Sequence, residues 1–396
     1  MTSRVLDTID PITLGKDLQK ARKRKGLTQE EAAKIIDAAR TTITAIESGF
    51  RRIKPEELQK LARAYDCEMS DLVRPHPEIE PFEVQFRGPA GKTKEDEIIA
   101  PLIEKLEWHC QNYLELEQLL EAPLDRKYPD EYSWPGVKVE QAAEATAIAE
   151  RQRLGLGDSP LPTLRDILEQ DVGLRIFYME LPQGYSAMYF YTNQLGGCIA
   201  VNKSHPEDRR RWSLAHDYGH FLAHRYKPTI SIDDFYQRLP ESERFADAFA
   251  GYFLMPTSSL MKRFSELRRP GKSISLTDLG NLAYAYGVSI QALVRRLEDM
   301  KLLPTGMWEG LQQRGLKVRE LQNRLGIATI PGRDSLFPLR YTDLAFEALS
   351  GSLIAEGRFA RLLNVDRLQA TKIAQELEEH MNLLRANEQM RNEPQF

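Results

Sequence analysis

Two histidines in the middle of the chain, His216 and His220, have the spacing of paired metal ligands. Residues i and i+4 of a helix lie on one face, about 6 Å apart along its axis, so both imidazoles can converge on one ion. A catalytic zinc ion takes three protein ligands and keeps one position for water. Glu243, on the next helical segment, is the carboxylate expected as third ligand. The pattern predicts a Zn2+ site made of His216, His220 and Glu243.

Asp247 lies four residues after Glu243, so both side chains are expected on one helix face. Asp247 would accept the second N–H of a ligand histidine and fix its tautomer. Plainer alternatives stay open, because an HxxxH pair recurs by chance and these acidic residues could form a solvated face. The order of HxxGH, ExxxD and then Leu254-Met255-Pro256 favours the metal site. His224, too far along the helix to share an ion with His216, is interpreted as a packing or surface group.

The elements that must position these residues are two helices, predicted over residues 208–226 and 241–256. Three β-strands precede them, over residues 174–181, 186–192 and 196–202, with Gly196-Gly197 as turn residues. Further helices surround this region, so the chain from about residue 137 is predicted to be α+β.

The N-terminal segment, residues 13–73, has a different pattern of five short helices. Gly26 is a helix-ending glycine, and Thr28 with Glu31 forms a capping box at the next helix start. The run Arg22-Lys23-Arg24-Lys25 is interpreted as an exposed charged face, with non-specific attraction to nucleic acid as the alternative.

Composition limits the class of protein. The chain has 396 residues and a net charge of −4, but residues 1–75 hold 15 Lys/Arg against 12 Asp/Glu, which favours nucleic-acid contact by this segment alone. No stretch of 18 apolar residues and no secretory h-region is present, so neither a membrane partner nor secretion is expected. Three separated cysteines fit a reducing compartment, and the expected location is the cytoplasm.

The segment RRRWSLAHDYGHFLAHR, followed by ERFADAFAGYFLMP, resembles the ImmA/IrrE metallopeptidases, and AYGVSIQALVRRLEDMKLL resembles that family's closing helices. The resemblance covers residues 137–303. It implies a zinc-dependent endopeptidase whose substrates are usually repressors with helix-turn-helix domains. It also implies His216, His220 and Glu243 as ligands, and the residue after the first histidine as general base.

That residue is Asp217, where the family has glutamate. The base must reach the attacking water and later carry its proton to the leaving amine. Aspartate is shorter by one methylene, roughly 1.5 Å, and a misplacement of about 1 Å can cost on the order of 10²-fold in rate. Asp217 is therefore either a weakened base that a shifted helix or second water compensates, or the mark of a pseudo-peptidase that keeps zinc without turnover.

Residues 13–73 resemble the XRE, lambda-repressor-like helix-turn-helix family through Gly26-Leu27-Thr28-Gln29, Ile43, Ile46-Glu47 and Gly49, with Ala39 where the family tends to have a Ser or Thr cap. In this motif the recognition helix enters the major groove by its N-terminal residues, and a dimer reads a near-palindrome in double-stranded DNA. The residues predicted to reach base edges are Arg40, Thr41, Thr44 and Ala45, and those predicted to hold phosphates are Gln29, Arg52 and Lys54.

The predicted fold class is mainly α and multidomain. It comprises a lambda-repressor-like domain (1–75), a linker and helical connector (76–136), an α+β zincin-like domain (137–303) and a helical C-terminal region (304–396). The predicted function is a homodimeric transcriptional regulator whose zinc domain cleaves a protein partner, such as a repressor, or the chain itself. The alternative is a non-catalytic repressor or antitoxin whose zinc domain senses a signal or binds a toxin. Residues 338–396 are interpreted as a helical hairpin, with only a faint likeness to a second helix-turn-helix.

Overall fold

The computed structural model describes residues 9–67, 69–73, 82, 94–232, 240–268, 274–314, 330–331 and 335–392. The chain divides into two units, Met1–Glu115 and Leu116–Phe396, with the boundary inside helix α8 (Lys94–Leu119). Most of the predicted connector before α8, residues 76–81 and 83–93, lies outside the described residues, and the four-part division stays a prediction. Within the described residues, no helix is long and apolar enough to cross a membrane.

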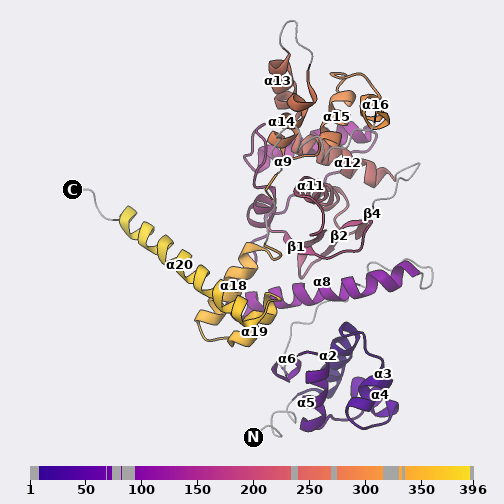
Figure 1. The fold of residues 1–396 in the computed structure, drawn as a ribbon, viewed down its shortest axis with the longest axis vertical. Helices are drawn as coiled ribbons and strands as arrows, with labels where there is room; N and C mark the ends of the chain where they lie inside the picture. Colours follow the sequence, from indigo (N-terminus) through magenta and orange to yellow (C-terminus); the bar gives the residue numbers. More distant parts are fainter. Residues whose placement is uncertain are drawn as a thin grey trace. The chain divides into compact units, whose positions relative to one another are not determined.

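In the described part of the N-terminal unit, five short helices lie between residues 11 and 73, as predicted (Figure 1). Their starts follow from local capping. The Asp10 carboxylate accepts from the backbone N–H of Thr13, and Thr28 and Glu31 form the predicted capping box. Gly26, with φ of +72°, ends the first helix. These helices are α2 (Pro11–Arg24), α3 (Gln29–Ile35), α4 (Arg40–Glu47), α5 (Pro55–Ala64) and α6 (Met69–Val73).

A buried ion pair lies inside this helical bundle. Arg22 Nε donates to Glu47 Oε1 at 2.6 Å and Arg22 Nη2 to Glu47 Oε2 at 3.0 Å, with the two side chains 8% and 3% exposed. The interpretation of Arg22–Lys25 as one exposed face was therefore wrong at Arg22, while the next three residues are exposed. Gly15 lets α2 and α4 pack closely, since a Cβ there would clash with the Ile46 carbonyl oxygen.

The second unit contains a four-stranded sheet of order β1-β3-β2-β4. β1 (Arg175–Met179) and β3 (Gly196–Asn202) are parallel, and β2 (Tyr185–Thr192) is antiparallel to β3 and to β4 (Thr229–Ile232). The three predicted strands are confirmed. β4 was not predicted, because four residues are too few to show an alternating pattern.

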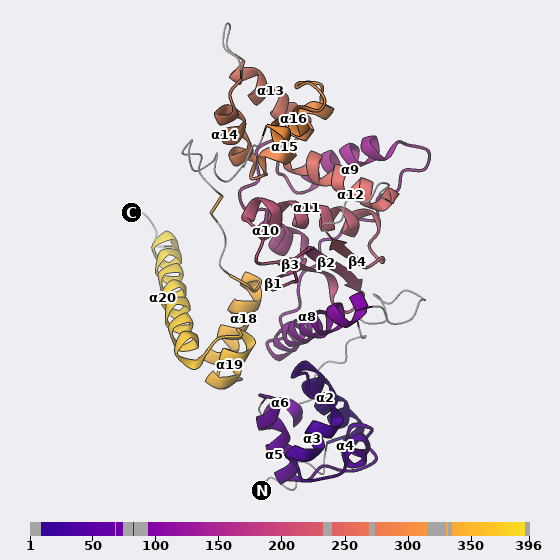
Figure 2. The same cartoon turned by 45° about the vertical axis from the view of Figure 1, so that its right-hand side comes forward.

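Helices cover the sheet in layers (Figure 2). α11 (Glu207–Ala223) packs on β2 and β3, and α12 (Glu241–Leu254) packs against both α11 and α9 (Val139–Arg153). Their facing sides form one apolar core with β1, β2 and β3. The remaining helices up to residue 313 are α10 (Leu164–Asp166), the π-helix η1 (Ile167–Val172), α13 (Thr257–Leu267), α14 (Leu276–Tyr286), α15 (Ile290–Asp299) and α16 (Met307–Gln313).

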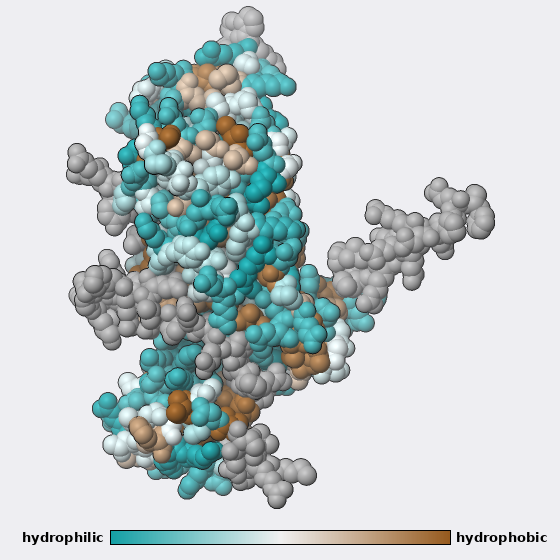
Figure 3. Space-filling model, turned by 180° about the vertical axis from the view of Figure 1, so that it is seen from behind, coloured by the Kyte–Doolittle hydropathy of each residue, from teal (hydrophilic) through white to brown (hydrophobic). Residues whose placement is uncertain are grey.

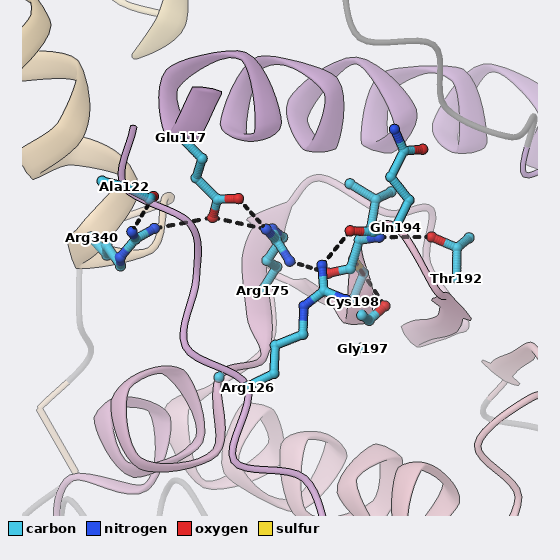
Figure 4. A network of polar contacts seen from close by, with 12 residues as sticks. Glu117, Ala122, Arg126, Arg175, Thr192, Gln194, Gly197, Cys198 and Arg340 are labelled. Carbon is cyan, nitrogen blue, oxygen red and sulfur yellow. Dashed lines mark hydrogen bonds and ion pairs between the residues drawn. The ribbon is translucent and has the colours of Figure 1, made fainter. Parts of the chain in front are cut away.

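The C-terminal helices are α18 (Leu339–Ser350), α19 (Glu356–Leu362) and α20 (Arg367–Asn392). A charged network links α18 to the sheet (Figure 4). The Glu117 carboxylate accepts from Arg175 Nη2 at 2.8 and 2.7 Å and from Arg340 Nη1 at 3.0 Å. Arg340 also donates to the Ala122 carbonyl at 2.6 Å.

On the face seen in Figure 3, hydrophobic residues form small patches among hydrophilic ones.

Candidate functional site

Helices α11 and α12 bring the three predicted metal ligands together. The Nε2 atoms of His216 and His220 lie 3.1 Å apart. Glu243 Oε2 lies 3.2 Å from Nε2 of His216, and Glu243 Oε1 lies 3.3 Å from Nε2 of His220. Among the described residues, these three are the group of His, Cys, Asp and Glu side chains with the spacing of a metal site.

These distances fit tetrahedral coordination of one metal ion. Bonds of about 2.0–2.1 Å at tetrahedral angles place neighbouring ligand atoms about 3.3 Å apart. The three observed edges of 3.1, 3.2 and 3.3 Å agree with that value. Two imidazole nitrogens facing each other at such a distance need a shared cation or proton between them. Two histidines and one carboxylate also match the donor set of catalytic zinc sites.

The charges at the site favour a bound cation. Burial opposes protonation of His216, but its hydrogen bonds to Asp247 and Glu243 outweigh this effect and raise its pKa to about 10. Burial lowers the pKa of His220. Burial alone would raise the pKa of Glu243, yet the two histidines hold it well below its usual range. The ionised carboxylate thus attracts positive charge, which either a proton or a metal ion can supply.

The Asp247 carboxylate contacts the ring nitrogen of His216 that does not face Glu243. Asp247 Oδ1 is 2.9 Å from Nδ1 of His216, which leaves Nε2 of that ring directed at Glu243. This geometry is the one that fixes a ligand tautomer. Nδ1 of His220 is buried and has no hydrogen-bond partner among the described residues. His224 lies just after α11, with its ring 6.0 Å from those of His220 and Trp134.

Asp217 occupies a closed environment. Its side chain is 0% exposed, on a helix that packs against β2. It lies near enough to His216 and to Tyr189 of β2 for its charge to act on both. Asp217 is therefore close to the candidate metal ligands and shielded from bulk water.

Gly219 has a structural role that the sequence reasoning missed. A Cβ at this position would lie 3.1 Å from Ala246 Cα and 3.1 Å from Phe249 Cδ1. A side chain here would have to push α12 away slightly, so glycine favours the close approach of α11 and α12 that brings Glu243 to the two histidines. A glycine inside a predicted helix was the available signal, because it is otherwise unfavourable there.

The residues predicted to contact DNA surround α4. Arg40, Thr41 and Thr44 are exposed on this helix, and Ala45 is half-buried. Ala39 provides no side-chain cap at its start. Arg52 and Lys54 are exposed in the turn that follows.

Gln29, the first residue of α3, forms contacts within the bundle. Its Nε2 donates to Glu47 Oε2 at 3.0 Å, and its Oε1 accepts from the Thr44 hydroxyl at 3.3 Å. These bonds hold the Gln29 side chain beside the recognition helix. Its contact with a phosphate stays a prediction.

Comparisons with known proteins agree with this architecture. Residues 169–298 match the M78 peptidase family described as IrrE N-terminal-like domain, and residues 18–72 match a helix-turn-helix family. These matches define a DNA-binding regulator that carries a peptidase-family domain. More particularly, the chain is a fusion of an XRE-type helix-turn-helix domain with an IrrE-like M78 domain, as the sequence resemblance indicated.

The other comparisons add little. No curated protein matched the chain. The structure titled "Crystal Structure of Bacillus thuringiensis PlcR in complex with the peptide PapR7 and DNA" is 13% identical, with 96% of this chain and 100% of that chain covered and a TM-score of 0.18. At this TM-score the likeness carries no structural argument.

Proposed function

We propose that this DNA-binding regulator holds a zinc ion in its IrrE-like domain and cleaves a protein partner, such as a repressor, at a reduced rate. The observation that carries the proposal is the triangle of ligand atoms with edges of 3.1, 3.2 and 3.3 Å. His216, His220 and Glu243 would hold the ion, and Asp247 would orient His216. When bound, zinc would supply the Lewis acidity that activates a water for attack on a peptide carbonyl.

Asp217 would then move the proton. Its carboxylate would take a proton from the attacking water and deliver it to the nitrogen of the leaving amine. The shorter side chain predicts slow transfer, because a displacement of about 1 Å can cost on the order of 10²-fold in rate.

The complete burial of Asp217 favours a second candidate function. In this alternative the zinc domain is non-catalytic, and the protein represses transcription as an antitoxin whose zinc domain binds a toxin or senses a signal. Both candidates need the metal site, so only the role of Asp217 separates them.

Substitutions of Asp217 are expected to decide between the two functions. Asp217→Glu should raise cleavage of the repressor or other protein encoded beside this chain, because the longer side chain can reach the attacking water. Asp217→Asn should abolish cleavage, because an amide cannot accept the proton. The measurement is mass spectrometry of the co-expressed partner and of the chain itself, with and without a zinc chelator. Intact partners in wild type and in all variants, with unchanged repression, would establish the non-catalytic function.

DNA-binding measurements on two variants are expected to distinguish contacts with base edges from contacts with phosphates. Arg40→Ala should cost about 1–3 kcal/mol on the preferred site and relax the preference at one base position, because a base-edge contact is lost. Lys54→Ala should weaken binding to all sequences alike and reduce the salt dependence. Fluorescence anisotropy over a salt series measures both effects. Sequence-specific binding that survives deletion of residues 1–75 would show that another part of the chain reads DNA.

A further inference from the structure

A cavity of about 360 Å³ lies at the far end of α12 from the metal ligands, lined by α9, the loop after it and the junction of α12 with α13. Its volume is within the range of small-molecule sites, about 300–1,000 Å³. Glu243 belongs to the first turn of α12, while Tyr252, which lines the cavity, comes nine residues later. At 1.5 Å per residue, the two ends lie about 13 Å apart along the helix. The cavity is thus separate from the metal centre.

Two carboxylates of the cavity wall have acceptor atoms to spare. Glu144 Oε1 accepts from the Thr257 hydroxyl at 2.5 Å, and Asp158 Oδ2 accepts from the Ser258 hydroxyl. These bonds anchor one oxygen of each carboxylate. Glu144 is half-buried and Asp158 is exposed, and in the part of the chain that the structure describes neither Glu144 Oε2 nor Asp158 Oδ1 has a hydrogen bond to protein, and neither carboxylate has an ion-pair partner.

Two arginines lie near these carboxylates without forming an ion pair with them: the charge of Arg151 interacts with that of Asp158, and Arg296 Nη2 donates to the Thr257 hydroxyl at 2.8 Å. Arg151 also lines the cavity, but its guanidinium donates to the carbonyls of Gly157 at 2.7 Å, Phe253 at 2.5 Å and Ser159. Three backbone carbonyls thus fix its position. Its role is to hold the loop after α9 against α12 and so to shape the cavity.

The rest of the wall includes apolar groups. Ile148 is 53% exposed although it is a large aliphatic residue, and it lines the cavity together with Tyr252 and Pro256. Hard metal ions prefer a shell of six or more oxygen ligands. Two carboxylates beside aliphatic and aromatic surface instead suit an organic cation, whose stem packs on the apolar wall while its charged end meets the carboxylates.

We propose that this cavity binds a guanidinium or ammonium group carried on a short apolar stem. Glu144 and Asp158 would accept its hydrogen bonds, and Ile148 would pack on the stem. The same chemistry occurs in free amines and guanidines and in basic side chains of a peptide. The proposal is independent of zinc and of peptide cleavage.

Calorimetric titration of the full-length protein tests whether the cavity binds such a cation. The probes are agmatine, for a free ligand, and N-acetyl-arginine amide, for a peptide side chain, with N-acetyl-citrulline amide as the uncharged match. We expect saturable binding of at least one charged probe and at least tenfold weaker binding of the citrulline compound. The tighter of the two charged probes identifies the source of the ligand.

Variants locate the site. The double variant Glu144→Gln/Asp158→Asn should weaken binding at least tenfold. Glu140→Gln is the matched control, because Glu140 lies one turn earlier on α9 and pairs with Arg244 at 2.6 Å outside the cavity; it should leave binding unchanged. Should the double variant fail to fold, Ile148→Ser, at an exposed position, should still weaken binding. The proposal is overturned if neither charged probe binds, if citrulline binds equally, or if folded cavity variants bind like wild type.

Discussion

Replacement of His220 by alanine is expected to remove zinc from the purified protein, from about one ion per chain to almost none. His220 provides one corner of the ligand triangle and is 0% exposed, so water cannot readily replace its imidazole. The two remaining ligands, His216 and Glu243, would hold the ion too weakly to survive purification. Elemental analysis by inductively coupled plasma mass spectrometry, against protein concentration, measures the change.

Two controls make this result specific. His224→Ala removes another histidine next to the same helix, but His224 is not part of the triangle, so zinc content should be unchanged. Asp217→Ala should likewise retain zinc, because Asp217 is not a ligand. Equal metal content in wild type and in a His216→Ala/His220→Ala double variant would disprove the metal site.

The parts of the site that the sequence predicted depend on local geometry. His216 and His220 lie one helical turn apart within apolar flanks, so their convergence requires only that the helix forms. Glu243 could be chosen because it lies in the first turn of a second helix, with Asp247 at the same i, i+4 spacing. The start of α3 after Thr28 was predictable for the same reason, since the capping box involves neighbouring residues.

The parts that were missed depend on contacts between distant residues. β4 is defined by its pairing with β2 rather than by its own four residues. The close approach at Gly219 depends on Ala246 and Phe249 of another helix. The Arg22–Glu47 pair joins residues 25 positions apart, and Arg22 stands in a basic run that reads as an exposed face. Helical spacing places Arg22 four residues after Leu18, on the buried face of α2, but its residue type within a basic run indicated an exposed position.

Loss of the Arg22–Glu47 ion pair is expected to have a large effect on stability. Glu47→Ala is expected to destabilise the helix-turn-helix bundle by about 3–5 kcal/mol, because it leaves the Arg22 guanidinium buried without its partner. Whole domains are stable by only about 5–15 kcal/mol. The variant should therefore lose most hydrogen-exchange protection in residues 11–64 and bind its DNA site more weakly. Hydrogen–deuterium exchange mass spectrometry of the full chain reads this region separately from the zinc domain.

The matched control is Glu30→Ala, which removes a glutamate whose pair with Lys34 is about 70% exposed on both sides. An exposed pair of this kind contributes less than about 1 kcal/mol, so protection should hardly change. The double variant Arg22→Met/Glu47→Leu should recover part of the lost stability, since well-packed apolar residues can replace a buried ion pair. Equal protection in Glu47→Ala and wild type would mean that the pair contributes nothing.

The same pair predicts how stability depends on pH. Burial would raise the pKa of Glu47, but hydrogen bonds from Arg22 and Gln29 outweigh this effect and lower it below the ordinary value of 4.5. The folded state therefore binds the proton less tightly than the unfolded chain. The stabilisation is fully present above pH 4.5 and is lost as the pH falls through the lowered pKa of the folded state. Glu47→Ala should remove this part of the acid sensitivity, so protection in wild type and variant should converge towards low pH. The recognition helix ends at Glu47, so conditions that protonate this carboxyl should also weaken DNA binding by Arg40 and Thr44.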